Sequence, residues 1–422
     1  MRAADARQRE TRSGAAVTSS RTGVATRDRP GTVFIGHEIY RQAAYGTPHP
    51  LAIARVESVM DLCRALGWFA DGEDRVSPRA TDAQLAWFHS PDYVNALRRA
   101  SETGRVDVET RCRHAIGTME NPLFPGLFER AATSVGGSIR AGELALEGRI
   151  VFHPAGGTHH GRPDRASGFC YFNDPVFAIL ALLRGGAERV LYVDLDAHHG
   201  DGVQDAFESD PRVRTISIHE RGRWPHSGDV SETGRGRACN LPVPARLNDT
   251  ELGTLLDQVV LPLGRRVAPD ALVITCGADA LDGDPLSTMA LSNVALWSAV
   301  ERIVALAPAI VVLGGGGYNP WTVTRYWTGL WGRLSGRDIP TTLPRESGEI
   351  LLRLRCDLID EEDVRAEWLT TLADQPHHGA VRDEIGILVN QALTCVDDAL
   401  WRPSMSYTGP KHAPVSGRET IT

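Results

Sequence analysis

Residues 190–202 read VLYVDLDAHHGDG, an apolar run of strand length that leads directly into aspartate, histidine and glycine. An apolar run of this kind is typical of a strand that is buried on both faces. Comparable runs occur at Thr32–Ile35, Ile150–His153, Val213–His219, Ala271–Thr275 and Ala309–Leu313. Amphipathic stretches of helix length separate them, at Leu51–Leu66, Gly126–Leu146, Pro175–Arg184, Asp249–Arg266 and Asn293–Ala305. This alternation predicts an α/β fold with a central parallel sheet and helices on both faces.

The chain ends predict one catalytic domain between two tails. Residues 1–30 are rich in arginine and poor in bulky apolar side chains, which predicts a disordered tail. After Pro344 the strands stop, and we predict helices at 350–359, 364–372 and 381–396 that pack onto the same domain. Residues 401–422 are polar and predict a second tail. The domain is therefore expected to span residues 31–400.

Charge and composition indicate which binding partners and which cell compartment suit the protein. The net charge is −8, which gives no general attraction for nucleic acid or an anionic membrane surface. The chain has seven cysteines, of which no two form a C-x-x-C pair, and this scatter is typical of a reducing compartment, here the cytoplasm. No stretch of the sequence approaches the roughly 20 apolar residues that span a bilayer. The sequence does not predict an oligomeric state.

Polar clusters follow four of the expected strands. They are the segments 154–161 (PAGGTHHG), 196–202 (DAHHGDG), 276–279 (CGAD) and 314–318 (GGGGY). Ligands bind at the carboxyl ends of strands in open α/β sheets. We therefore expect the four clusters to meet at one edge of the sheet and to form the functional site.

The cluster after residue 193 predicts a metal site. Side chains at 194, 196 and 198 point the same way on an extended chain, so Asp196 and His198 can reach one ion. Asp279, after another strand, can supply a third ligand, which leaves a position open as in catalytic zinc sites. An oxygen-rich set also suits Fe(II), Mn(II) or Co(II). An arginase-type pair of Mn(II) ions is disfavoured, because Gly200 and Gly277 occupy positions where that chemistry needs aspartates.

Three further side chains suit amide hydrolysis. His159 and His160 can divide proton transfer, one accepting a proton from water and one donating to the leaving amine. Each needs a carboxylate to orient it, and Asp194 and Asp201 are the candidates. Tyr318 can donate a hydrogen bond to the developing oxyanion. Two aromatic residues in nearby loops are either tunnel walls or ordinary loop anchors, Phe169 and Trp224.

Five motifs, in order and spacing, resemble the histone deacetylase family. They are PAGGTHHG (154–161), SGFCYFND (167–174), YVDLDAHHGDGVQ (192–204), TCGADALDGDPL (275–286) and GGGGYNP (314–320). The similarity runs from about Phe34 to about Trp331 and includes the bacterial acetoin-utilisation deacetylases and class I-like members. It implies the arginase–deacetylase fold and a zinc-dependent hydrolase that removes N-acetyl groups, with acetate as a product.

The resemblance also implies roles for individual residues. The zinc ligands would be Asp196, His198 and Asp279, and the catalytic groups would be His159 with Asp194, His160 with Asp201, and Tyr318. The substrate-binding residues would be Gly168, Phe169, Trp224, Gly316 and Arg55, the last near an internal acetate pocket. A structural potassium ion would lie by Asp194, Asp196, His198, Ser217 and Ile218, largely on backbone carbonyls.

Two positions depart from the family pattern and bear on the substrate. Trp224 stands where phenylalanine is usual, which narrows the expected tunnel, and Glu120 stands in place of an aspartate that grips the substrate backbone. The expected substrate is an acetyl-lysine side chain of a protein, and the alternative is an acetylpolyamine or another small acylated amine. An acetyl-binding protein without turnover is a third hypothesis, which the complete set of catalytic residues disfavours.

Overall fold

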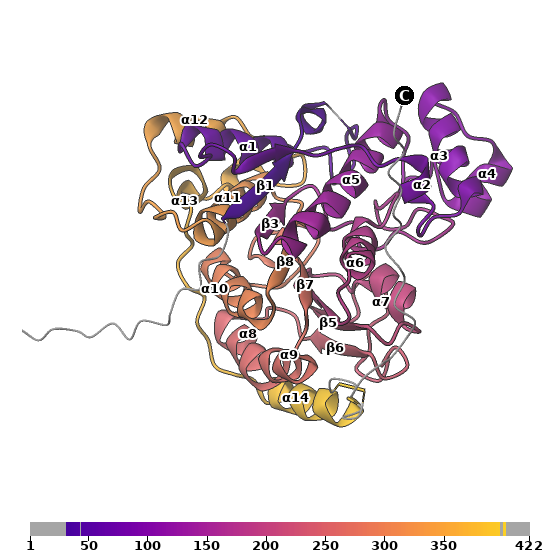
Figure 1. The fold of residues 1–422 in the computed structure, drawn as a ribbon. Coiled ribbons are helices and arrows are strands. Elements are labelled where there is room, and N and C mark those ends of the chain that lie inside the picture. The colour runs from indigo at the N-terminus through magenta and orange to yellow at the C-terminus, as the bar shows by residue number, and fades with distance from the viewer. Residues whose placement is uncertain (1–30, 43, 397–399, 402–422) are drawn as a thin grey trace, which may run out of the picture.

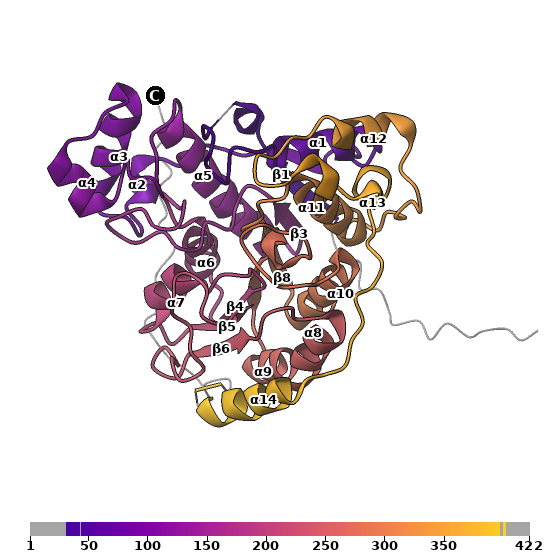
Figure 2. The same cartoon turned by 180° about the vertical axis from the view of Figure 1, so that it is seen from behind.

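The computed structural model describes residues 31–42, 44–396 and 400–401. Within these residues the chain forms one eight-stranded sheet in the order β2-β1-β3-β8-β7-β4-β5-β6, with every neighbouring pair parallel (Figures 1 and 2). The strands are β1 Thr32–Gly36, β2 Asp74–Val76, β3 Ile150–His153, β4 Val190–Asp194, β5 Val213–Glu220, β6 Ala238–Val243, β7 Ala271–Thr275 and β8 Ala309–Leu313. The predicted α/β class with a parallel sheet is confirmed.

Helices cover both faces of this sheet (Figure 1). The first half of the chain contributes α1 Val56–Ala65, α2 Asp82–Leu85, α3 Pro91–Thr103, α4 Val108–His114, α5 Leu127–Leu146, α6 Asp174–Arg184 and α7 Asp201–Phe207. The second half contributes α8 Asp249–Leu255, α9 Leu261–Val267, α10 Asn293–Ile303, α11 Pro320–Leu334, α12 Arg345–Leu352, α13 Ala366–Thr370 and α14 Asp383–Cys395.

Successive strand residues supply two separate apolar layers. On β4, Leu191 and Val193 pack into a large core with helices α1, α8 and α9 to α11, whereas Val190 and Tyr192 pack against α5, α6 and α7. All five β4 residues are buried, because the strand lies in the middle of the sheet between β5 and β7. This central position explains why residues 190–194 are almost wholly apolar until Asp194.

Several predicted boundaries were wrong for identifiable reasons. The short edge strand β2 is fully exposed and lacks an apolar run, so it was not predicted, and β6 was missed because Pro242 interrupts its pattern. The predicted helix 249–266 is confirmed in extent, with a π-helical turn at Leu256–Val260 between α8 and α9. The predicted helix 350–359 was also wrong, since α12 spans Arg345–Leu352.

Of the two predicted tails, the structure describes only residue 401. Residues 1–30 and 402–422, predicted as tails, lie outside the described residues. Trp401, which was assigned to the second tail, is fully buried, and its indole N–H donates to the Gly236 carbonyl at 2.9 Å. The packed part of the chain therefore reaches at least Trp401. None of the helices in the described part is long and apolar enough to cross a membrane.

Candidate metal centre and active site

The edge of the sheet where β3, β4, β7 and β8 end carries the four polar clusters. These strands are neighbours in the order β3-β8-β7-β4, so the residues that follow them meet although they are far apart in sequence. Glycines allow the close approach. A Cβ on Gly157 would lie 2.6 Å from the Gly315 backbone nitrogen, and one on Gly316 would lie 2.1 Å from Asp279 Oδ2. Side chains at these positions would push the clusters apart.

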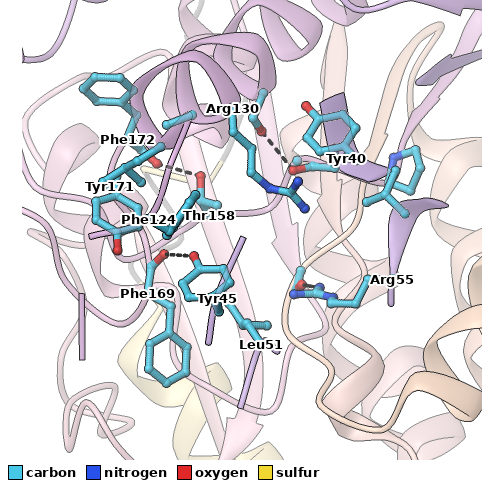
Figure 3. Close-up of a pocket in the computed structure, with 18 of the residues that line it drawn as sticks. Tyr40, Tyr45, Leu51, Arg55, Phe124, Arg130, Thr158, Phe169, Tyr171 and Phe172 are labelled. Atoms are coloured by element: carbon cyan, nitrogen blue, oxygen red, sulfur yellow. Dashed lines mark hydrogen bonds between the residues drawn. The ribbon is translucent and has the colours of Figure 1, made fainter. Parts of the chain in front are cut away.

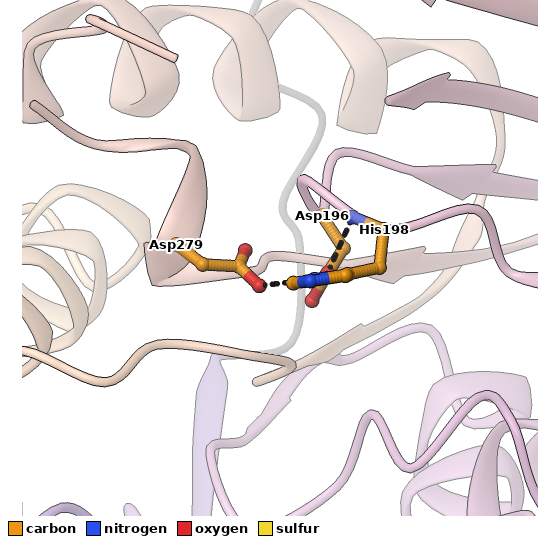
Figure 4. A group of neighbouring side chains, drawn as sticks. All are labelled: Asp196, His198 and Asp279. Atoms are coloured by element: carbon orange, nitrogen blue, oxygen red, sulfur yellow. Dashed lines mark hydrogen bonds and ion pairs between the residues drawn. The ribbon is translucent and has the colours of Figure 1, made fainter. Parts of the chain in front are cut away.

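Asp196, His198 and Asp279 form a group that can hold a metal ion. One ligand atom of each residue lies within 4.8 Å of the other two, and the three side chains point toward one another (Figure 4). His198 Nδ1 lies 2.8 Å from Asp279 Oδ2 and 3.2 Å from Asp196 Oδ1. The second oxygens are held by backbone N–H groups, from Gly316 to Asp196 and from Ala197 to Asp279. The acceptors are thereby fixed in place.

The charges of this group fit a divalent cation. Burial disfavours the cationic form of His198, but hydrogen bonds to Asp196 and Asp279 outweigh burial and raise the pKa of His198 to about 10. Burial and the negative charge of Asp196 raise the pKa of Asp279 to about 6. Two carboxylates and an imidazole this close in a dry site require positive charge among them. A cation with nitrogen and oxygen ligands, of which zinc is one, supplies that charge.

Two buried histidine–aspartate pairs stand beside the metal-binding group. His159 Nδ1 lies 2.7 Å from Asp194 Oδ2, and His160 Nδ1 lies 2.7 Å from Asp201 Oδ1. The imidazole rings of the two histidines are 4.0 Å apart. Asp194 also accepts the Tyr192 hydroxyl at 2.6 Å, so its position does not depend on His159 alone. The structure thus brings together both carboxylate partners that the sequence suggested.

The two histidines differ in protonation. Burial lowers the pKa of His159, but Asp194 and Asp196 outweigh burial and raise it to about 9. Burial and the charge of His159 lower the pKa of His160 to about 3, against the opposing effect of Asp201. Adjacent imidazoles in a low-dielectric site cannot both be cationic. The pKa values of the two histidines are therefore shifted in opposite directions, upward for His159 and downward for His160.

A cavity of about 460 Å³ opens from this site to the surface. Its lining includes six predicted site residues and the predicted rim residue, namely His160, Gly168, Phe169, His198, Trp224, Tyr318 and Glu120. Trp224 packs edge-on against His160, with ring centroids 4.6 Å apart. Tyr318 is buried, which raises the pKa of its phenol well above the ordinary value and keeps the hydroxyl protonated. Gly316 does not line this cavity and lies instead against Asp196 and Asp279.

A second cavity of about 130 Å³ contains Arg55 (Figure 3). The guanidinium of Arg55 donates to the Gly315 carbonyl, and its buried Nε has no partner among the described residues. Arg130 also lines this cavity, and Phe169 lines both cavities. Arg55 thus lines this second cavity, called the inner cavity below, and not the cavity that contains His160 and Tyr318.

Residues predicted for a potassium site lie side by side on the adjacent strands β4 and β5. Asp194 on β4 is paired in register with Ser217 on β5, and Ile218 follows Ser217. The Ser217 hydroxyl lies 2.9 Å from His219 Nδ1, and the Asp194 carboxylate faces His159. Asp194 thus directs its side chain toward His159.

Several groups of the site were not predicted. Asp284 accepts the Tyr318 backbone N–H at 2.7 Å, and Arg162 donates to Asp201. Asp174, the first residue of α6, accepts the Thr158 backbone N–H at 2.8 Å. Asp284 lies within the TCGADALDGDPL motif, which could have indicated it, whereas nothing in the sequence pairs Arg162 with Asp201.

Comparison with known proteins gives consistent matches. The histone deacetylase domain family matches residues 49–334. The acetoin utilization protein AcuC of Bacillus subtilis (strain 168) is 34% identical over 332 residues, covering 75% of this chain and 85% of that protein. Histone deacetylase 8 of Xenopus laevis is 34% identical over 278 residues, covering 64% and 85%. The crystal structure of a histone deacetylase homolog from Aquifex aeolicus is 36% identical with a TM-score of 0.82, covering 86% of this chain and 99% of that one.

Proposed function

The chain belongs to the histone deacetylase family, and on that premise we propose that it is a zinc-dependent deacetylase of acetyl-lysine side chains in proteins. Family membership supports a hydrolase of acetylated amides; the zinc ion, the protein substrate and the roles of single residues are our proposals. The observation that carries them is the pair of buried histidine–aspartate contacts, 2.7 Å each, beside the Asp196–His198–Asp279 group.

Asp196, His198 and Asp279 would hold the ion, which supplies Lewis-acid polarisation of the acetyl carbonyl when bound. His160 acts as the proton carrier. Its Nδ1 faces Asp201 and carries the proton, which leaves Nε2 as an acceptor in the cavity that His160 lines. Nε2 takes a proton from the attacking water and delivers it to the nitrogen as the C–N bond breaks. The products are acetate, which gains the water oxygen, and the free amine.

His159 and Tyr318 stabilise charge. A protonated His159, held by Asp194, adds positive charge 4.0 Å from the His160 ring as negative charge develops on the acetyl group. Tyr318 donates its hydroxyl to the developing oxyanion, since burial keeps that hydroxyl protonated. Acetate then leaves through the inner cavity, where the positive charge of the Arg55 guanidinium attracts it. The potassium ion by Ser217 and Ile218 is proposed as a structural element alone.

The cavity supports an extended substrate. Phe169 and Trp224 are apolar walls between the surface and His160, which suits the alkyl chain of a lysine. The alternative substrate is a small acetylated amine such as an acetylpolyamine, and the Glu120 carboxylate at the opening is the observation that favours it. We place the protein in the cytoplasm, because all seven cysteines are free.

The test is acetate release from an acetyl-lysine peptide and from acetylspermidine, measured in parallel on protein stripped of metal and then reloaded with Zn(II). Zinc-dependent turnover that favours the peptide is expected. Faster turnover of acetylspermidine than of the peptide would mean that the substrate is a small acetylated amine. Turnover that survives metal removal would refute the metal-dependent mechanism.

A further inference from the structure

The tunnel wall residue Phe169 lies at the tip of a tight turn. Ser167 and Cys170 exchange both backbone hydrogen bonds, at 3.1 and 2.9 Å, so that Gly168 and Phe169 are the two central residues of a two-residue hairpin loop. Both central residues have positive φ, +53° for Gly168 and +66° for Phe169. A turn of this kind favours glycine or asparagine at both positions, and a phenylalanine there costs roughly 1–2 kcal/mol. Contacts with another part of the chain must offset this conformational cost.

Two consecutive side chains from a distant loop bind the tip of this turn. The Gly168 N–H donates to Glu120 Oε1 at 3.1 Å, and the Phe169 N–H donates to Asn121 Oδ1 at 3.0 Å. Both N–H groups of the tip therefore have acceptors that lie about 48 residues earlier in the chain. Successive N–H groups at a turn with positive φ form a concave site for acceptor oxygens. Here protein side chains occupy that site.

The loop that supplies these acceptors is held by hydrogen bonds of its own. Asn121 is fully buried, its backbone N–H donates to the Thr118 hydroxyl at 2.9 Å, and its carbonyl accepts the Gly117 N–H at 2.8 Å. Asn121 Nδ2 also donates to Glu120 Oε2 at 3.3 Å, which orients the two acceptors relative to each other.

The Phe169 ring and carbonyl have their own contacts. The ring packs edge-on against His49 at 4.6 Å and faces Tyr318 at 6.0 Å between centroids. The Phe169 carbonyl accepts the Tyr45 hydroxyl at 3.5 Å (Figure 3). Since Phe169 lines both cavities, a shift of this turn would change the width of the substrate opening and of the inner cavity together.

We infer that Glu120 and Asn121 are positioning residues that hold the Gly168–Phe169 turn and thereby set the position of the aromatic tunnel wall. Glu120 acts by binding another part of the same chain, because one of its carboxylate oxygens already accepts the Gly168 N–H. Asn121 acts on the substrate only through Phe169. The inference rests on the proposed function in that it treats Phe169 as a wall of the substrate tunnel.

The test is a double-mutant cycle of Asn121→Leu and Phe169→Ala, read as KM and kcat on an acetyl-lysine peptide. Asn121→Leu removes the acceptor at similar size, and we expect KM to rise about tenfold with a smaller change in kcat. In the Phe169→Ala background the same substitution should change KM less than twofold, because the wall on which it acts is gone. Asn121→Asp keeps an oxygen for the Phe169 N–H and should restore KM to within about threefold. Equal KM effects in both backgrounds would overturn the inference.

Hydrogen exchange reads the same contact without any substrate. In Asn121→Leu, or in Glu120→Ala if the first variant does not fold, the amides of 168 and 169 should exchange at least tenfold faster while β4 and β7 keep their protection. Met119→Ala is the matched control, since this neighbouring side chain is 96% exposed. Unchanged exchange at 168 and 169 would refute the inference. This readout stands even if the protein hydrolyses an amide other than acetyl-lysine, so failure of the proposed function is seen separately.

Discussion

The loop that carries His159 and His160 depends on His89 being uncharged. His89 is buried, its Nδ1 lies 3.0 Å from the Arg162 carbonyl, and its Nε2 accepts the Asn173 backbone N–H at 3.1 Å. Asn173 in turn donates through Nδ2 to the carbonyls of His159 and Gly161. Protonation of His89 would place an N–H against the Asn173 N–H. Burial accordingly lowers the pKa of His89 from 6.5 to about 3.

The magnitude follows from linkage. The folded pKa is depressed, so the unfolded chain binds the proton first as the pH falls. The stability that a neutral His89 provides is complete above pH 6.5, declines through the window from 6.5 to about 3, and is lost below it. One pKa unit corresponds to about 1.4 kcal/mol, so this site should destabilise the protein by about 2 kcal/mol between pH 7.5 and pH 5.

The variant His89→Gln isolates this effect, because a neutral amide keeps an acceptor for the Asn173 N–H at every pH. Urea unfolding of both proteins at pH 7.5 and pH 5, followed by tryptophan fluorescence, gives the difference in free energy of unfolding at each pH. Other buried histidines titrate in both proteins and cancel. We expect this difference to move by about 2 kcal/mol in favour of the variant at pH 5. A difference that does not change with pH would refute the reasoning.

Three further predictions concern the site itself. Tyr318→Phe should lower kcat by roughly 10²–10³-fold, measured as acetate release, with bound zinc unchanged by elemental analysis; normal turnover would remove the hydroxyl from the mechanism. Asp279→Asn should weaken zinc binding by about 100-fold or more in a competition with a chelating dye, since loss even of an outer partner costs about 10–100-fold, and unchanged affinity would exclude Asp279 as a ligand. Trp224→Phe should raise the ratio of butyryl to acetyl hydrolysis by roughly tenfold, because the indole packs against His160; a constant ratio would show that this wall does not select the acyl group.

The sequence by itself determined the layer architecture and the candidate residues of the site. Strands such as Ala271–Thr275 and Ala309–Leu313 were predicted to the residue, because strands buried on both faces are continuous apolar runs. Asp196 and His198 do lie together as predicted, but the predicted reason was wrong, because β4 ends at Asp194 and the chain bends at 196–198 instead of alternating along a strand. The exposed strand Asp74–Val76 had no such signal, because its stability comes from pairing with β1 rather than from burial of its side chains.

Tertiary structure decided which groups meet. The residues alone left open which aspartate serves which histidine, although the family resemblance paired them, and the order of strands around β4 is what places Asp194 against His159 and Asp201 against His160. Asn121 carried no signal at all, because its partner is a backbone N–H 48 residues away and backbone groups look alike in every sequence. Local periodicity determines which faces of a segment are buried. Contacts between distant loops depend on how the completed sheet brings their ends together, so only the folded chain reveals them.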